Sequence, residues 1–334
     1  MFPACALFEE LRKKSHDVCM ITDKRGEVFC KDIQRKIVFA TVRFSYKSIL
    51  SILANFTVVF FRLLKMWRGQ RPKVIVSFGG ISTFVPVLVA KLLGAKVVVY
   101  EQNAVMGKAN LLLSKIANLK LSSFDFGDGW TQIQAPVREG FRRTIPYKCD
   151  DKLKILIIGG SQGARSFSEI IPNFLARLTE YEKKKIEIVQ QVSYGDIEAL
   201  SATYDKLHVK HKLLKFIDNV AEIMQDSQLA ICRAGASTLA ELSALGCPAI
   251  LIPLPTSAEN HQFFNAMSYQ KKGAAWVLEE KSGVDKLIAD KVKVFLQNRE
   301  LLKKAASCMM NDSMENDRNR FLRLVESVSG EISK

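Results

Sequence analysis

The sequence predicts an α/β protein with two Rossmann-like, doubly wound parallel-sheet domains that face each other across a cleft. Two observations lead to this fold class. Short apolar runs alternate with segments of helical periodicity, which is typical of parallel sheets covered on both faces. The alternation also restarts near residue 150, and a length of 334 residues suits about two domains.

The first half opens with an amphipathic helix over 5–15, and no strand precedes it. The strands expected after it are 18–22, 37–42, 73–77 and 96–100. A Rossmann-like half normally begins with a strand, a glycine-rich turn and a helix. The first strand and glycine loop of this domain are therefore expected to be absent.

The second half contains the more regular series of strands. They are predicted at 154–158, 186–191, 213–216, 229–232, 249–253 and 275–278. A linker is expected around Pro136. The predicted domains are 1–137 and 138–314, and a C-terminal helix over 315–334 could pack back on the first domain.

The charge of the chain is strongly positive, at +15, and it is uneven. No acidic residue occurs between Asp32 and Glu101, whereas eleven basic residues do. Such a field attracts an anionic partner, either nucleic acid or a membrane surface. No recognition-helix or RNA-binding motif accompanies the charge. The prediction is an anionic membrane surface and no nucleic acid.

An apolar run over 49–61, interrupted by Ser51, Asn55 and Thr57, is too short to span a bilayer, and Arg62, Lys65 and Arg68 follow it directly. Apolar residues between Ile49 and Trp67 recur at steps of three and four, so they form a stripe on one helical face. One interpretation is a core helix with a solvated basic end, which we expect for most of the stripe. The other places its C-terminal end on a membrane. The residues of that membrane-facing end are Phe60, Leu63, Trp67, Arg62, Lys65 and Arg68.

The seven cysteines are scattered, and no two have a C-x-x-C spacing. No cluster of cysteine and histidine suggests a metal site. Reduced thiols, no metal and no cofactor are the expectation.

The strongest motif is ILIIGGSQGAR at 155–165, in which a buried strand enters a glycine-rich turn and then a helix. Amides at such a helix start bind anions such as a diphosphate. Candidate ligand-binding residues here are Ser161, Gln162 and Gly163. Gln190-Gln191 at the tip of the next strand disfavours NAD, which would require an acidic residue. A tight turn without a ligand is the alternative.

Two further motifs follow later strands. After 229–232 comes a small-residue turn, Ala236-Ser237-Thr238, and then Glu241, whose carboxylate could bind both hydroxyls of a ribose. After 249–253 a proline-rich loop leads to His261 and Gln262, which suit sugar hydroxyls. Taken singly, Glu241 and His261 could equally be ordinary surface residues.

The first half offers two comparable strand ends. Gly79-Gly80 forms a glycine-rich turn after 73–77, and Glu101-Gln102-Asn103 ends the strand 96–100. Each is weak alone, but five polar motifs at strand ends favour a ligand site in a two-domain α/β protein.

Together these motifs resemble the MurG family of cell-wall glycosyltransferases, which is glycosyltransferase family 28 with the GT-B fold. The matching segments are GGSQGAR at 159–165, the turn and helix 233–241, EQN at 101–103 and PVR at 136–138. The resemblance covers essentially the whole chain. It implies an enzyme that works as a peripheral protein on the cytoplasmic face of the inner membrane.

The resemblance also implies residue roles. Ile217 would lie against uracil, Glu241 would hold the ribose, and His261 with Gln262 would bind the GlcNAc hydroxyls. The diphosphate of UDP-GlcNAc would be contacted from three places: Arg138, the glycine-rich turn with Ser161, Gln162 and Gly163, and the turn with Ala236, Ser237 and Thr238. The acceptor, lipid I, would be bound by Gly79, Gly80, Gln102 and Asn103.

The implied reaction is an inverting transfer of GlcNAc from UDP-GlcNAc to the C4 hydroxyl of undecaprenyl-diphospho-MurNAc-pentapeptide, which gives lipid II. Backbone amides and a helix N-terminus, rather than a metal, would stabilise the leaving UDP.

The chain departs from this family at its beginning. Members carry a GGTGGH loop, with the histidine usually proposed as the base, just before the segment that matches Phe2-Pro3-Ala4. Without it, Glu101 and Asn103 are the candidate catalytic residues. Three explanations stay open: a shortened or mis-started chain, a divergent enzyme that uses another base, and a catalytically impaired UDP-sugar-binding protein. A related GT-B glycolipid transferase is the alternative enzyme.

Overall fold

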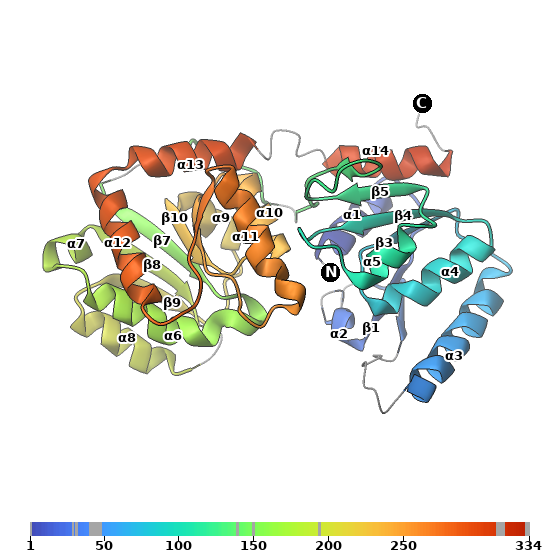
Figure 1. Ribbon diagram of the computed structural model, residues 1–334, viewed down its shortest axis with the longest axis horizontal. Helices are drawn as coiled ribbons and strands as arrows, with labels where there is room; N and C mark the ends of the chain where they lie inside the picture. Colours follow the sequence, from blue (N-terminus) through green and yellow to red (C-terminus); the bar gives the residue numbers. More distant parts are fainter. Residues whose placement is uncertain are drawn as a thin grey trace. The chain divides into compact units, whose positions relative to one another are not determined.

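A computed structural model describes residues 2–28, 30, 33–39, 49–137, 140–148, 151–192, 195–311 and 318–330. The chain divides into two compact units (Figure 1). Unit 1 comprises Met1–Arg138 and Asn316–Lys334, and unit 2 comprises Glu139–Glu315.

Unit 1 contains parallel strands in two groups. β1 pairs with β2, and β3, β4, β5 and β6 form a second sheet in that order. The strands are β1 (Met20–Asp23), β2 (Lys36–Phe39), β3 (Val74–Ser77), β4 (Lys96–Glu101), β5 (Leu119–Ser122) and β6 (Thr131–Gln132). The prediction missed β5 and β6, because β5 is short and carries Lys120, and β6 has only two residues.

The helices of unit 1 pack on these strands. They are α1 (Phe2–Lys13), α2 (Lys24–Glu27), α3 (Ile49–Trp67), the 3-10 turn η2 (Ile81–Thr83), α4 (Phe84–Leu92), α5 (Lys108–Leu113) and α14 (Arg318–Ser329). α3 packs against α4 through an apolar cluster centred on Leu63, Val85 and Val89 (Figure 1). α14 contacts α1, β3 and β4, so the end of the chain belongs to the first unit.

Unit 2 is a six-stranded parallel sheet with the order β12-β11-β10-β7-β8-β9. The strands are β7 (Leu153–Ile158), β8 (Ile186–Gln191), β9 (Lys210–Leu214), β10 (Leu229–Cys232), β11 (Ala249–Leu251) and β12 (Ala275–Val277). This is the doubly wound order of a Rossmann fold. The predicted fold class is confirmed, but the strand predicted at 213–216 lies three residues earlier. The error follows from the edge position of β9, because Lys210, His211 and Lys212 in its first half break the apolar pattern by which a strand is predicted.

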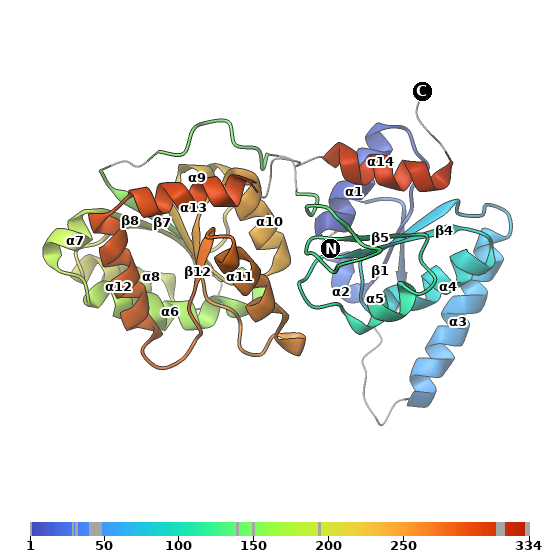
Figure 2. The ribbon, with the colours of Figure 1, turned by 45° about the horizontal axis from the view of Figure 1, so that its top comes forward.

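Helices cover both faces of this sheet, as Figure 2 shows. They are α6 (Gly160–Ala176), α7 (Glu180–Lys184), α8 (Ile197–Lys206), α9 (Val220–Asp226), α10 (Ala236–Leu245), the 3-10 turn η3 (Ala258–Asn260), α11 (His261–Lys271), α12 (Val284–Gln297) and α13 (Glu300–Asn311). α6 packs with α8 and α12, and α10 packs with α9 and α13. A large apolar core fills the space between the sheet and the α6 layer.

The docking of α14 on α1 should depend on pH. Glu326 on α14 is 5% exposed and is paired with Lys14 at 3.2 Å and with His16 at 2.9 Å. Burial alone would raise the pKa of the Glu326 carboxyl, but the hydrogen bonds from His16 and Lys14 outweigh it and hold that pKa below its usual value. A carboxyl with a lowered folded-state pKa contributes stability above its unfolded pKa, about 4.3.

The Glu326 contribution should therefore be lost as the pH falls through the folded pKa. We expect Glu326→Gln to lower the midpoint of thermal unfolding at neutral pH, and the difference from wild type to shrink under acid. Glu10→Gln is the control, because Glu10 is more exposed than Glu326 and its pair with Lys13 is a surface pair within α1. A Glu326→Gln difference that stayed constant with pH would contradict this account.

Candidate functional site

The glycine-rich motif lies at the point in the unit 2 sheet where the chain stops adding strands on one side of β7 and begins adding them on the other side. β7 and β10 are neighbouring parallel strands, and Ile158 is paired with Cys232 at their carboxyl ends. From β7 the chain goes first to β8 on one side and later to β10 on the other. Ligands of doubly wound sheets bind in the crevice outside the strands at such a switch point. The turns after β7 and β10 therefore flank a ready binding position.

A third predicted motif is brought to the same edge. β11 pairs with β10 so that Cys232 opposes Leu251, and the proline-rich loop to α11 leaves from that end. The three loops predicted to hold the donor thus follow three adjacent strands. Two of them lead into helices whose N-termini, Gly160 in α6 and Ala236 in α10, have no side-chain cap. Uncapped first-turn amides can donate to an anion.

Arg233 binds these loops together, and sequence reasoning gave it no role. Its side chain is buried directly after β10 and stacks on Phe167 of α6, 4.8 Å from the ring centre. One nitrogen, Nη2, donates to Ser166 of α6 at 2.8 Å, and the other, Nη1, to the Ile252 carbonyl at 3.0 Å. Nη1 also forms an ion pair with Glu280 beyond β12. An arginine directly after a wholly apolar strand was the signal that could have found it.

Glu241 lies in the second turn of α10 and is 9% exposed. The turn before it, Ala236-Ser237-Thr238, is half-buried at the start of the same helix. An acidic side chain held on the helix that begins beside β7 suits the ribose role that was predicted. The carboxylate and the glycine-rich bend thus come from elements on two neighbouring strands.

The start of α11 holds its polar side chains in defined orientations. His261 Nδ1 is 2.7 Å from the Ala258 carbonyl, so this nitrogen is the donor and Nε2 is left directed away from that contact. Gln262 Oε1 accepts from the amide of Leu254 at 3.0 Å, which fixes the proline-rich loop. Buried Asn265 donates to the Ala234 carbonyl at 3.1 Å and ties α11 to the turn after β10.

Some predicted donor residues are placed differently or cannot be placed. Ile217 is only 6% exposed, whereas Phe216 beside it is 68% exposed. Phe216 therefore exposes much more of its side chain than Ile217 does, and the contact of Ile217 with uracil stays a prediction. Ser161, Gln162 and Gly163 lie in the first turn of α6, but their side chains lie outside the described part of the structure, and so does Arg138.

The predicted acceptor residues in unit 1 also end neighbouring strands, β3 and β4. Gly79 and Gly80 have φ of 82° and 88°, which favour glycine. Glu101 is 4% exposed, and Gln102 and Asn103 beside it are half-buried. The Glu101 carboxylate is surrounded by hydrogen-bond donors of its own loop.

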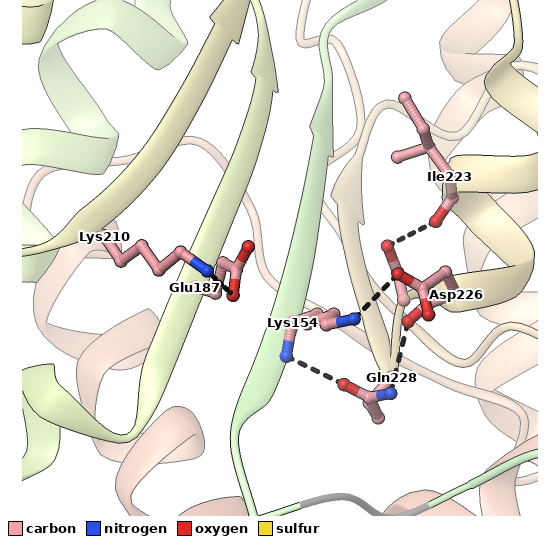
Figure 3. A network of polar contacts seen from close by, with 7 residues as sticks. Lys154, Glu187, Lys210, Ile223, Asp226 and Gln228 are labelled. Carbon is pink, nitrogen blue, oxygen red and sulfur yellow. Dashed lines mark hydrogen bonds and ion pairs between the residues drawn. The ribbon is translucent and has the colours of Figure 1, made fainter.

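The opposite end of the unit 2 sheet carries a separate polar network, shown in Figure 3. Lys154 at the start of β7 pairs with Asp226 at 2.8 Å, and its amide donates to Gln228 just before β10 at 2.8 Å. These contacts fasten β7 to β10 where the strands begin. They position the sheet but lie away from the predicted ligand edge.

Within the described part of the chain, no three His, Cys, Asp or Glu side chains are grouped as a metal would require. No helix among the described residues is both long and apolar enough to cross a membrane.

Comparison with known proteins places the chain in a family. The model described as the glycosyltransferase family 28 C-terminal domain matches residues 154–319, and the family 28 N-terminal domain matches residues 1–120. The chain belongs to glycosyltransferase family 28. Family 28 relatives include the UDP-N-acetylglucosamine–N-acetylmuramyl-(pentapeptide) pyrophosphoryl-undecaprenol N-acetylglucosamine transferase of Rickettsia felis. It is 31% identical, over 94% of this chain and 92% of that protein.

The protein of the same name from Rhodospirillum rubrum is 32% identical, over 98% of this chain and 89% of that protein. Among solved structures, MurG of Acinetobacter baumannii matches with a TM-score of 0.82 and 24% identity, over 98% of this chain and 95% of that one. This likeness confirms the GT-B fold of the family 28 chain.

Proposed function

We propose that this family 28 glycosyltransferase transfers GlcNAc from UDP-GlcNAc to the C4 hydroxyl of a polyprenyl-diphospho-MurNAc-pentapeptide, lipid I, and so makes lipid II. The observation that carries the proposal is the convergence of three donor motifs at the carboxyl ends of β7, β10 and β11. The names of the full-length relatives support the same substrates.

The donor would lie across the switch point. Amides at the starts of α6 and α10 would bind the diphosphate, and Glu241 would accept hydrogen bonds from the ribose hydroxyls. His261 Nε2 would form a hydrogen bond with a sugar hydroxyl, because Nδ1 is already engaged by the Ala258 carbonyl. The C4 hydroxyl of the acceptor attacks the anomeric carbon from the face opposite UDP while the bond from that carbon to the UDP oxygen breaks, so the configuration is inverted, and the hydroxyl proton passes to a general base or to water in or after the transition state. The helix N-termini would stabilise the charge that develops on the leaving UDP.

A transfer assay tests this function. The full chain would be incubated with radiolabelled UDP-GlcNAc and a soluble lipid I analogue, and the lipid-soluble label counted. We expect label in a β1→4-linked disaccharide. Tight UDP binding without any transfer would contradict the proposed transferase activity and would indicate a UDP-sugar-binding protein instead. Transfer to diacylglycerol in place of the analogue would indicate a related glycolipid enzyme.

We also propose that unit 1 rests on an anionic membrane surface through α3, with a revised set of residues. Leu63 is fully buried and so belongs to the core, whereas Phe60 and Trp67 are partly buried against the same cluster and expose only part of their side chains. Among the side chains of α3 that the structure describes, over 56–67, the large apolar ones that are exposed are Val58 at 65%, Phe61 at 61% and Met66 at 43%.

The exposed face of α3 is basic as well as apolar. Arg62 and Lys65 are exposed on the same helix, and exposed Arg68 follows directly after its last residue. Val58, Phe61, Arg62 and Lys65 are separated by three or four residues and share a face. Apolar side chains flanked by cations are typical of a helix that lies in the interface of an anionic bilayer.

Phe61→Asp should weaken binding to phosphatidylglycerol vesicles by about tenfold or more, since burying a phenylalanine contributes about 1.5–3 kcal/mol. Vesicle sedimentation would measure it, with phosphatidylcholine vesicles for comparison. Val294→Asp is the control, because Val294 is a similarly exposed apolar residue on α12 of unit 2. Equal binding by both variants would contradict this placement of the membrane surface.

A further inference from the structure

Three segments of unit 1 meet at Asn110, a residue of α5 that the motifs did not single out. Asn110 is 1% exposed. Its Nδ2 donates to Glu101 Oε2 at 2.8 Å and to the Tyr100 carbonyl at 3.1 Å, both at the end of β4. Its Oδ1 accepts from the Ser77 hydroxyl at 3.4 Å, at the end of β3. One buried amide therefore links two strand ends to a helix.

The Glu101 carboxylate is fully engaged by these neighbours. Oε1 accepts from the amide of Asn103 at 3.0 Å and from the Asn103 side chain at 3.3 Å. Oε2 accepts from the amide of Gly107 at 3.1 Å, in addition to Asn110. A carboxylate offers about four lone-pair positions, and four donors occupy them. The geometry suits an anchor of the loop and leaves no acceptor position directed at a substrate hydroxyl.

The glycine turn after β3 depends on the same residues. The amide of Gly79 donates to the Ser77 hydroxyl at 3.3 Å, and that hydroxyl is also 3.2 Å from the hydroxyl of Thr83. A Cβ built on Gly79 would come within 3.1 Å of Asn110 Nδ2. The turn thus packs directly on the Asn110 amide, so its shape follows the position of that side chain.

We propose that Asn110 is a positioning residue for the acceptor, and that Glu101 anchors the loop instead of accepting the proton. Asn110 holds the Gly79-Gly80 turn and the Glu101–Asn103 loop in one arrangement without touching the substrate. The inference rests on the proposed function, in which these two loops bind lipid I. It predicts that loosening the network raises the KM for the acceptor and leaves UDP binding unchanged.

Asn110→Asp gives the sharpest test, because it places a second carboxylate beside Glu101. At about pH 8 the two charges repel, and kcat/KM for the lipid I analogue should fall about 10- to 100-fold. As the pH is lowered, one proton shared by the pair restores the hydrogen bond, so the variant should regain activity relative to wild type. Calorimetry should show wild-type UDP affinity, which indicates that unit 2 is folded, and a cooperative thermal unfolding transition with a wild-type circular dichroism spectrum should show that unit 1 is folded as well.

Glu101→Gln separates an anchor from a base. Loss of a general base lowers kcat about 10²- to 10⁴-fold at saturating acceptor and removes the acid limb of the pH–rate profile. If Glu101 is an anchor, Glu101→Gln should mainly raise the KM for the acceptor, and the pH–rate profile should keep its acid limb. A selective loss of kcat in Glu101→Gln, or an Asn110→Asp defect that is independent of pH, would overturn the inference.

Thermal unfolding tests the network even if no sugar is transferred. A wild-type chain without transferase activity would refute the proposed function, not the hydrogen bonds. In that case the midpoint of Asn110→Asp, measured relative to wild type, must still rise toward wild type as the pH falls. A constant difference would refute the network itself.

Discussion

Arg233→Met is expected to destabilise unit 2 and to weaken UDP binding at the same time. The substitution removes the ion pair to Glu280 and the hydrogen bonds to Ser166 and Ile252. Removing one partner of a buried ion pair typically costs about 3–5 kcal/mol. We expect about 2–4 kcal/mol here, because Glu280 is 24% exposed and keeps some contact with water. Urea unfolding followed by circular dichroism measures the loss.

A surface arginine provides the matched control for Arg233. Arg177 at the end of α6 pairs with Asp285 of α12 and is 48% exposed. Exposed pairs contribute about 0–1 kcal/mol, so Arg177→Met should be nearly neutral and should bind UDP normally. If the two variants lost similar stability, Arg233 would not be the link between the donor loops.

Glu241→Ala should weaken the binding of UDP by about 1–3 kcal/mol, the usual cost of losing hydrogen bonds to a charged group. This corresponds to roughly 5- to 150-fold in the dissociation constant, which calorimetry measures. Glu169→Ala serves as a control, since Glu169 is exposed on the outer side of α6. Unchanged UDP affinity in Glu241→Ala would remove the ribose assignment.

The ligand itself offers a second control for Glu241. Wild type should bind the 2′-deoxy form of UDP more weakly than UDP, because one hydroxyl donor is missing. Glu241→Ala should bind the two forms about equally, since the variant lacks the carboxylate that would accept a hydrogen bond from the 2′ hydroxyl. A preference for UDP that survives in the variant would assign the ribose contact to another residue.

The sequence predicted the buried part of the fold well. The strands at 186–191 and 229–232 match β8 and β10 residue for residue. β10 is a continuous apolar run, as expected of a strand buried on both faces of a parallel sheet, and β8 alternates buried with partly exposed residues. Edge strands lack this signal. β9 was displaced by its charged residues, and the two-residue β6 has no pattern at all.

The candidate site was predictable only in part. Motifs at strand ends identified the loops, since parallel strands bring their carboxyl ends to one edge. The residues that hold those loops act over long separations in sequence. Asn110 meets Ser77 33 positions away, and Arg233 reaches Ser166 67 positions away. Periodicity gave the stripe of α3, but packing on α4 decided that Leu63 is buried and Phe61 exposed.

A crystal structure of the full chain with UDP would test the central claim most directly. We predict that the diphosphate lies within hydrogen-bond distance of the first amides of α6 and that the ribose hydroxyls meet the Glu241 carboxylate. Both contacts should occur in the same molecule of UDP, outside the ends of β7 and β10. A nucleotide bound elsewhere, or one whose ribose lies out of reach of Glu241, would contradict the account.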